Sequence, residues 1–260
     1  MDKSDIQNHI SSTYFSLRFA LAGLAFAFPI VLWALGPEQS TPVHLQGSMS
    51  AYYWVGGADS SRWLRDMFVG FLFAIGSLLY AYKGFSRLES VLLNVAAVAA
   101  FVVALFPMNW WGRLSPIPVM GPEGLQILFF EPTRGYIHNC AAILLFFCIA
   151  FVSIRCSKDT LSLLPATANR YWFENAYKLT GHLMWALPVF VVCVNYGRRL
   201  LGSKETDQLT YWLEFAGIYA FAMFWSVKTY ELSLSRAEEP LETRSDRSHQ
   251  PPPNKYNASA

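Results

Sequence analysis

Six long apolar runs divide this chain, and they limit its possible folds more than any other feature of the sequence. They cover about residues 14–36, 67–82, 91–107, 137–154, 179–196 and 211–227. About 20 apolar residues in a helix cross the roughly 30 Å hydrocarbon core of a bilayer. Lipid offers no hydrogen-bond partners to an open backbone, so isolated spans must be helical. The sequence therefore predicts an all-α integral membrane bundle of six transmembrane helices.

The composition excludes several other classes of protein. Charged residues make up 15% and hydrophobic residues 53% of the 260 residues, whereas about a quarter of the residues in a soluble domain are charged. This excludes a soluble two-domain enzyme and a disordered chain. The net charge of +2 is too small to indicate a nucleic-acid partner. None of the four cysteines falls in a predicted extracytoplasmic loop, so we expect no disulfide framework.

The first apolar run has two possible interpretations. Lys3 and Arg18 precede or enter it, as basic residues precede the apolar part of a signal peptide. The run is longer than that apolar part, and no small-residue cleavage pattern closes it. We therefore interpret it as a retained first span, with the Arg18 side chain reaching back toward the N-terminal side of the membrane.

Orientation follows from the basic residues in the loops. Six spans place both termini on one side, and lysine and arginine are more frequent on that side than on the other. Such a bias marks the cytoplasmic face. We therefore expect cytoplasmic termini in a bacterial cytoplasmic (inner) membrane. Residues 1–232 form the predicted six-helix domain. Residues 233–260 form a predicted disordered cytoplasmic tail, because their charges balance and few apolar residues are available to bury.

Small residues spaced four apart predict where the spans pack closely. Helices in lipid associate through such residues, because no hydrophobic force drives them together. The predicted packing positions are Gly23 and Ala27, Gly70 and Ala74, Ala96, Ala100 and Ala104, and Ala216 and Ala220.

Polar residues gather at the predicted extracytoplasmic ends of the spans. They are Arg65, Asp66, Asn109, His138, Asn139, Arg198 and Glu214. Ionisable groups near membrane depth usually pair with each other or line a wet cavity. One interpretation is therefore a polar pocket, open to the extracytoplasmic side, that binds a lipid or small amphiphile. The other is that these residues only mark the membrane–water boundary, where polar groups cost little. The sequence leaves both open.

The pocket hypothesis assigns roles to four of these residues. Asp66 and Glu214 are the anionic anchors, Arg65 is their partner or a headgroup contact, and His138 is the titratable group. A lipid-modifying enzyme is an alternative, in which His138 and one carboxylate perform acid–base chemistry. A structural or assembly subunit is another. A transporter component is disfavoured, because such proteins need polar residues through the middle of the membrane.

We expect neither a metal nor another cofactor. Asp66, His138 and Glu214 are residue types that bind zinc or iron. However, the chain has only one histidine at that level and contains neither H-E-x-x-H nor H-x-x-x-H. The nucleotide-binding motifs G-x-G-x-x-G and Walker A are also missing from the sequence, so nucleotide chemistry has no support from a motif.

Several short motifs resemble those of a known group of proteins. They are S-x-S-x-Y-Y from Ser48 to Tyr53, R-D-x-F-V-G from Arg65, A-L-F-P up to Pro107, I-H at His138 and W-L-E up to Glu214. Together they resemble a broad group of bacterial six-span inner-membrane proteins with no assigned activity. The resemblance covers most of the chain from the first loop to the sixth span. It implies the same topology, and it supports Asp66, His138 and Glu214 as candidate functional residues. It implies no reaction.

Overall fold

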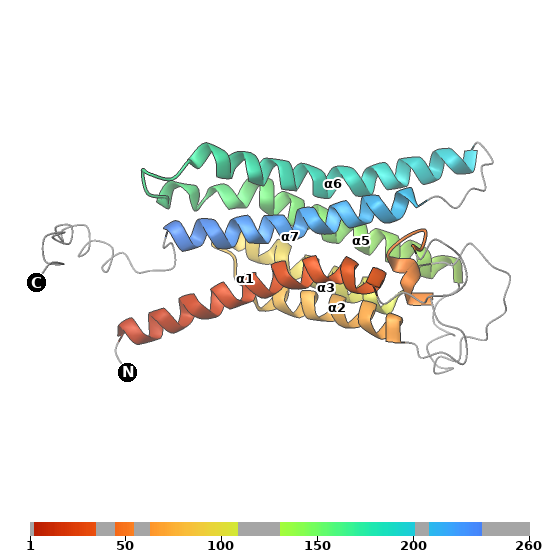
Figure 1. Cartoon of the computed structure of the whole chain (residues 1–260), viewed down its shortest axis with the longest axis horizontal. Helices are drawn as coiled ribbons and strands as arrows, with labels where there is room; N and C mark the ends of the chain where they lie inside the picture. The colour runs from red at the N-terminus through yellow and green to blue at the C-terminus, as the bar shows by residue number, and fades with distance from the viewer. Residues whose placement is uncertain (1–2, 35–44, 55–62, 109–130, 201–207, 236–260) are drawn as a thin grey trace, which may run out of the picture.

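The computed structural model describes residues 3–34, 45–54, 63–108, 131–200 and 208–235. Within these residues, six long helices form a bundle (Figure 1). They are α1 (Lys3–Ala34), α2 (Trp63–Ala81), α3 (Arg87–Leu105), α5 (Glu131–Arg155), α6 (Arg170–Leu200) and α7 (Leu209–Ser235). Three short 3-10 helices are η1 (Ser50–Trp54), η2 (Cys156–Lys158) and η3 (Leu161–Leu163). The predicted all-α class is confirmed.

Five of the long helices are sufficiently long and apolar to cross a membrane. These candidate spans are Asn8–Ala34, Trp63–Ala81, Arg87–Leu105, Gly135–Leu163 and Arg170–Arg198. They make this a multi-pass membrane protein. The sixth helix, α7, is 27 residues long and contains the predicted sixth span. It is not among these five candidate spans, and its sequence includes Glu214 and Lys228 together with several tryptophan and tyrosine residues.

The six helices form a closed ring. Each helix packs against the next along the chain, and α7 packs against α1 to close the ring. Successive helices run in opposite directions, so the first turn of α1 and the last turn of α7 lie at the same end of the bundle (Figure 1). We call this end, which also holds η2 and η3, the Lys228 end. The opposite end, where η1 packs against α2, is the Glu214 end.

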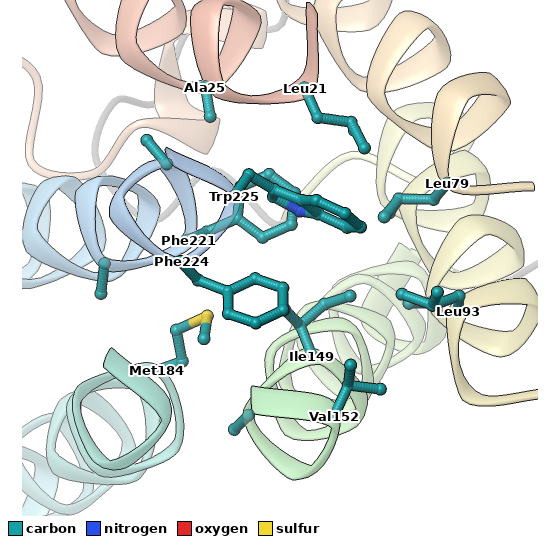
Figure 2. Packing of buried hydrophobic residues seen from close by; sticks show 14 of the residues in the cluster. Leu21, Ala25, Leu79, Leu93, Ile149, Val152, Met184, Phe221, Phe224 and Trp225 are labelled. Atoms are coloured by element: carbon teal, nitrogen blue, oxygen red, sulfur yellow. The ribbon is translucent and has the colours of Figure 1, made fainter. Parts of the chain in front are cut away.

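Aromatic side chains of α7 fill the middle of this ring. Figure 2 shows Trp225, Phe221 and Phe224 meeting apolar side chains from the other helices. Trp225 is only 1% exposed, and its ring packs edge-on against Tyr82 with 5.0 Å between centroids. Bulky rings at this position satisfy the need for close packing inside the bundle.

The packing predictions from small residues are partly confirmed. Ala96, Ala100 and Ala104 are buried along α3, as expected. The predictions for α1 and α2 are wrong within this chain, because Gly23 and Gly70 are exposed and a Cβ on either would meet nothing within 4 Å. Close approach occurs instead at Gly181 of α6, where a Cβ would lie 3.1 Å from the Ala150 carbonyl oxygen. Small residues permit close packing of helices, and the arrangement of the helices in the ring determines which small residues lie at an interface.

Several helices extend beyond the apolar runs that predicted them. α6 begins at Arg170 and α7 continues to Ser235, past the predicted domain boundary at residue 232; the remainder of the predicted tail lies outside the described residues. The Arg18 side chain is buried and only 1% exposed. Arg18 is the 16th residue of α1, which begins at Lys3, and the direction of its side chain relative to the membrane stays a prediction.

Candidate functional site

A hydrogen bond between the first loop and α7 organises the Glu214 end. The Met49 backbone N–H donates to Oε2 of Glu214 across 2.6 Å. The rings of Tyr52 and Tyr211, both buried, lie beside this contact with 6.2 Å between their centroids. Burial raises the pKa of the Tyr52 hydroxyl, so this ring remains uncharged.

Two buried serines extend this polar region toward the end of α3. The Ser48 and Ser50 hydroxyls lie 3.1 Å apart, and both lie within hydrogen-bond distance of the Met108 sulfur, at 3.2 and 2.9 Å. The indole N–H of Trp54 donates to the Met108 carbonyl oxygen across 2.9 Å. The segment with the S-x-S-x-Y-Y motif, which includes the start of η1, therefore packs against the residues that follow α3. Its backbone donates a hydrogen bond to the glutamate of the W-L-E motif.

The other residues predicted for this site lie in different surroundings. Arg65 and Asp66 pair with each other at the surface, with 3.1 Å between Nη2 and Oδ1. His138 is buried, and its Nδ1 lies 2.8 Å from the Phe106 carbonyl oxygen. Since a carbonyl only accepts hydrogen bonds, Nδ1 carries the proton. In the part of the chain that the structure describes, no hydrogen bond joins His138 to Asp66 or Glu214.

The remaining predicted residues add little to this geometry. Asn139 is exposed, and Arg198 is half-buried. Asn109 lies outside the described residues. Over the described ranges, no group of three or more histidine, cysteine, aspartate or glutamate side chains is arranged to hold a metal ion. Of the residues predicted for the pocket, Glu214 is therefore the one that the fold brings into a cluster of polar groups. The binding role of all seven predicted residues stays a prediction.

A second polar cluster lies at the opposite end of α7, where the sequence predicted none. Lys228 and Glu231 are 1% and 0% exposed, and their charged atoms Nζ and Oε2 lie 3.2 Å apart. The Tyr177 hydroxyl of α6 donates to the same Glu231 oxygen across 2.8 Å. Lys228 Nζ donates to Thr160 Oγ1, also across 2.8 Å. We call Phe85, Thr160, Tyr177, Lys228 and Glu231 the lysine cluster.

Glu89 is a further buried carboxylate near the lysine cluster. It is 2% exposed, and it interacts electrostatically with Lys228. Its Oε2 accepts a hydrogen bond from the Phe85 N–H at 2.8 Å, while Ser86 Oγ caps the helix by accepting from the Glu89 N–H at 3.2 Å. This reciprocal capping satisfies the free N–H groups at the start of α3. It also places the turn before α3 against Lys228.

Sequence reasoning missed the lysine cluster for an identifiable reason. Lys228 directly follows the sixth apolar run, which is the usual position of a basic residue on the cytoplasmic side of a span. The K-x-x-E spacing of Lys228 and Glu231 does place both on one helical face. Their partners Thr160 and Tyr177 come from segments more than 50 residues away, and no local pattern reports such a contact.

Comparison with protein-family models finds no match, and comparisons with curated proteins and with solved structures find none either. The described residues contain two polar clusters. One contains the half-buried Glu214, and the other contains the fully buried pair Lys228 and Glu231.

Proposed function

We propose that this protein is a six-span protein of the bacterial cytoplasmic membrane that binds a lipid or small amphiphile at its Glu214 end. α7 is the sixth span, since it packs between α1 and α6 in the ring. Membership of the bacterial six-span group is part of the proposal. Its support is that two of the motifs, S-x-S-x-Y-Y and W-L-E, meet through the hydrogen bond from Met49 to Glu214.

The state of the Glu214 carboxylate is the observation that carries this proposal. One oxygen is held by the Met49 N–H, so the side chain is fixed in position. Among the described residues, nothing donates a hydrogen bond to its other oxygen. The side chain is only partly buried, and the proposal places the headgroup of the bound molecule at its exposed part. A fixed carboxylate with a spare acceptor at a membrane boundary suits a headgroup that donates hydrogen bonds.

Aromatic side chains beside Glu214 suit the apolar part of such a molecule. Trp212 is 50% exposed and packs edge-on against Phe215, which stacks on Tyr219 with 4.3 Å between centroids. Tryptophan and tyrosine favour the headgroup level of a bilayer. An ammonium headgroup placed on Glu214 leaves an acyl chain free to lie along these rings. We therefore expect an amine-bearing lipid such as phosphatidylethanolamine, or a simpler alkylammonium amphiphile, to bind better than an anionic lipid.

Removing the Glu214 charge is expected to weaken this binding. The Glu214→Gln variant retains an oxygen that accepts from Met49, so the end of the bundle remains folded. A hydrogen bond to a charged group contributes about 1.5–3 kcal/mol, so phosphatidylethanolamine should bind about tenfold more weakly or worse. Native mass spectrometry of the purified protein, titrated separately with phosphatidylethanolamine, dodecylammonium and phosphatidylglycerol, measures each affinity and separates a lipid from a simple amphiphile.

Asp66→Asn is the matched control for this experiment. It also removes a carboxylate at the Glu214 end, but from a side chain that is 65% exposed and already paired with Arg65. Its affinity for phosphatidylethanolamine should be unchanged. Equal affinity in the wild type and Glu214→Gln, or no preference for an amine headgroup in the wild type, contradicts the proposed function.

The exposed basic residues support an orientation with the Lys228 end in the cytoplasm. Those described at this end are Lys83, Arg87, Arg155, Lys158, Arg170 and Lys178. Their main acidic neighbour is Glu174, which forms salt bridges with both Lys158 and Lys178, at 3.6 and 2.9 Å. An excess of basic residues beside the spans favours the cytoplasmic side. Both termini then lie in the cytoplasm.

Cysteine labelling tests this orientation. Single cysteines are introduced at Ser162 and at Asp66, both exposed and at opposite ends of the bundle, in a variant without the four native cysteines. A membrane-impermeant maleimide should label Asp66→Cys in intact spheroplasts and Ser162→Cys only after lysis. The reverse pattern places the Lys228 end outside the cell.

A further inference from the structure

We propose that the lysine cluster is a binding site for a small primary ammonium cation, and that Lys228 fills it as a built-in ligand. The site consists of Phe85, Thr160, Tyr177 and Glu231, which come from the turn before α3, the connection between α5 and α6, α6 itself and α7. This site is at the opposite end of α7 from Glu214, and it is independent of the proposed amphiphile binding.

The contacts of Lys228 are those that an ammonium group requires. Its Nζ donates to Thr160 Oγ1 at 2.8 Å and to Glu231 Oε2 at 3.2 Å. It also lies 5.5 Å from the centroid of the Phe85 ring and 5.6 Å from that of Tyr177. Cations within about 6 Å of a ring centroid are attracted to the π face. A hydroxyl, a carboxylate and two rings thus surround the charge on several sides.

One oxygen of Glu231 has no hydrogen-bond donor although Lys228 occupies the site. Glu231 is 0% exposed. Its Oε2 accepts from both Lys228 and Tyr177, whereas its Oε1 is buried and accepts from no group in the described part of the chain. A buried acceptor without a donor is unfavourable. A ligand with several N–H donors, which is what an ammonium ion offers, satisfies it.

The surrounding charge and the position of Phe85 also fit a cation. Glu231 and Glu89 are two buried carboxylates near the single ammonium of Lys228, so the local charge favours a positive ligand. Phe85 is 43% exposed while its ring contacts Lys228. It is therefore the one residue of the lysine cluster that is exposed at the Lys228 end.

Filling the site joins segments that are distant in the sequence. Lys228 belongs to α7, but its ammonium contacts the α5–α6 connection, α6 and the turn before α3. An ammonium ion in the site therefore keeps the Lys228 end closed. A free alkylammonium ion should do the same when Lys228 is removed.

The test is chemical rescue of the Lys228→Ala variant. Alanine removes three carbons and the ammonium group, which n-propylammonium replaces. We expect the Tm of the purified variant, followed by tryptophan fluorescence, to lie below that of the wild type and to rise with the concentration of n-propylammonium chloride. n-Propanol, which has no charge, and tetramethylammonium, which has no N–H donor, should not raise it. Lys83→Ala is the matched control, because Lys83 is an exposed lysine at the same end, with its Nζ 5.8 Å from the Tyr80 ring centroid.

Two outcomes overturn the proposal. One is a rescue by n-propanol as large as that by n-propylammonium. The other is an undiminished rescue in the double variant Lys228→Ala/Glu231→Gln, for which we expect at least a tenfold higher ammonium concentration to be needed. If Lys228→Ala does not accumulate in membranes, n-propylammonium in the growth medium should restore its yield, and failure to do so also counts against the proposal.

Cys156 provides a readout that does not depend on unfolding. This thiol is 5% exposed and lies at the start of η2, close to the lysine cluster. We expect maleimide to modify it at least tenfold faster in Lys228→Ala than in the wild type, and n-propylammonium to reverse the increase. A thiol equally protected in both proteins contradicts the closing role of Lys228.

Discussion

Replacing Lys228 by methionine is expected to lower the free energy of unfolding by about 3–5 kcal/mol, because one partner of a buried ion pair is removed. Glu231 then remains completely buried, with the Tyr177 hydroxyl as its remaining donor among the described residues. Reversible unfolding of the protein in mixed micelles, titrated with sodium dodecyl sulfate, measures the loss. Lys83→Met, at an exposed position of the same end, should change the free energy of unfolding by no more than about 0.5 kcal/mol.

The double variant Lys228→Met/Glu231→Leu distinguishes an uncompensated charge from lost packing. Two apolar side chains in place of a buried pair are often as stable as the pair itself, so the double variant should recover most of the loss. A double variant that is less stable than Lys228→Met shows instead that the ion pair contributes net stability. Recovery in the double variant would mean that stability alone does not explain a buried lysine and glutamate here.

Trp225→Ala is expected to destabilise the bundle by a similar amount, about 3–5 kcal/mol, because truncating a large buried ring leaves a cavity that the surroundings fill only in part. The indole lies in the middle of the helix ring (Figure 2) and packs against Tyr82, Phe221 and Phe224. The same titration with sodium dodecyl sulfate measures the effect.

Trp33→Ala is the control for the effect of losing a tryptophan. Trp33 is 53% exposed on α1, so its removal leaves no internal cavity. An equal loss of stability in both variants contradicts a closed ring whose interior is filled by side chains of α7. A much larger loss in Trp225→Ala supports the closed arrangement.

The pattern of apolar runs was sufficient to predict the helices, because a bilayer restricts the chain at every span. About 20 apolar residues and an internally hydrogen-bonded backbone are needed wherever the chain crosses. The sequence therefore predicts all six long helices of the described chain. The ends of the helices were less predictable. The capping of α3 by Ser86 and Glu89 depends on local hydrogen bonds, and helix formation does not stop where the apolar residues stop.

The candidate site was predictable only in part. Glu214 and the S-x-S-x-Y-Y motif were identified separately, and the hydrogen bond between Met49 and Glu214 joins residues from the first loop and the last helix. The expected convergence of Asp66, His138 and Glu214 does not occur through hydrogen bonds among the described residues, because Asp66 faces the surface with Arg65 and His138 binds the Phe106 carbonyl. A position at the end of a span specifies depth in the membrane, and it does not specify the direction in which a side chain points.

The sequence by itself indicated that this is a membrane protein, and it predicted the long helices of the residues that the structure describes. These properties depend on transfer between water and lipid, which acts on each segment separately. The tertiary structure alone decided that α7 closes the ring, that Arg18, Glu89, Lys228 and Glu231 are buried, and that Lys228 meets Thr160 and Tyr177. Those outcomes depend on contacts between segments far apart in the chain, and no single segment of the sequence contains them.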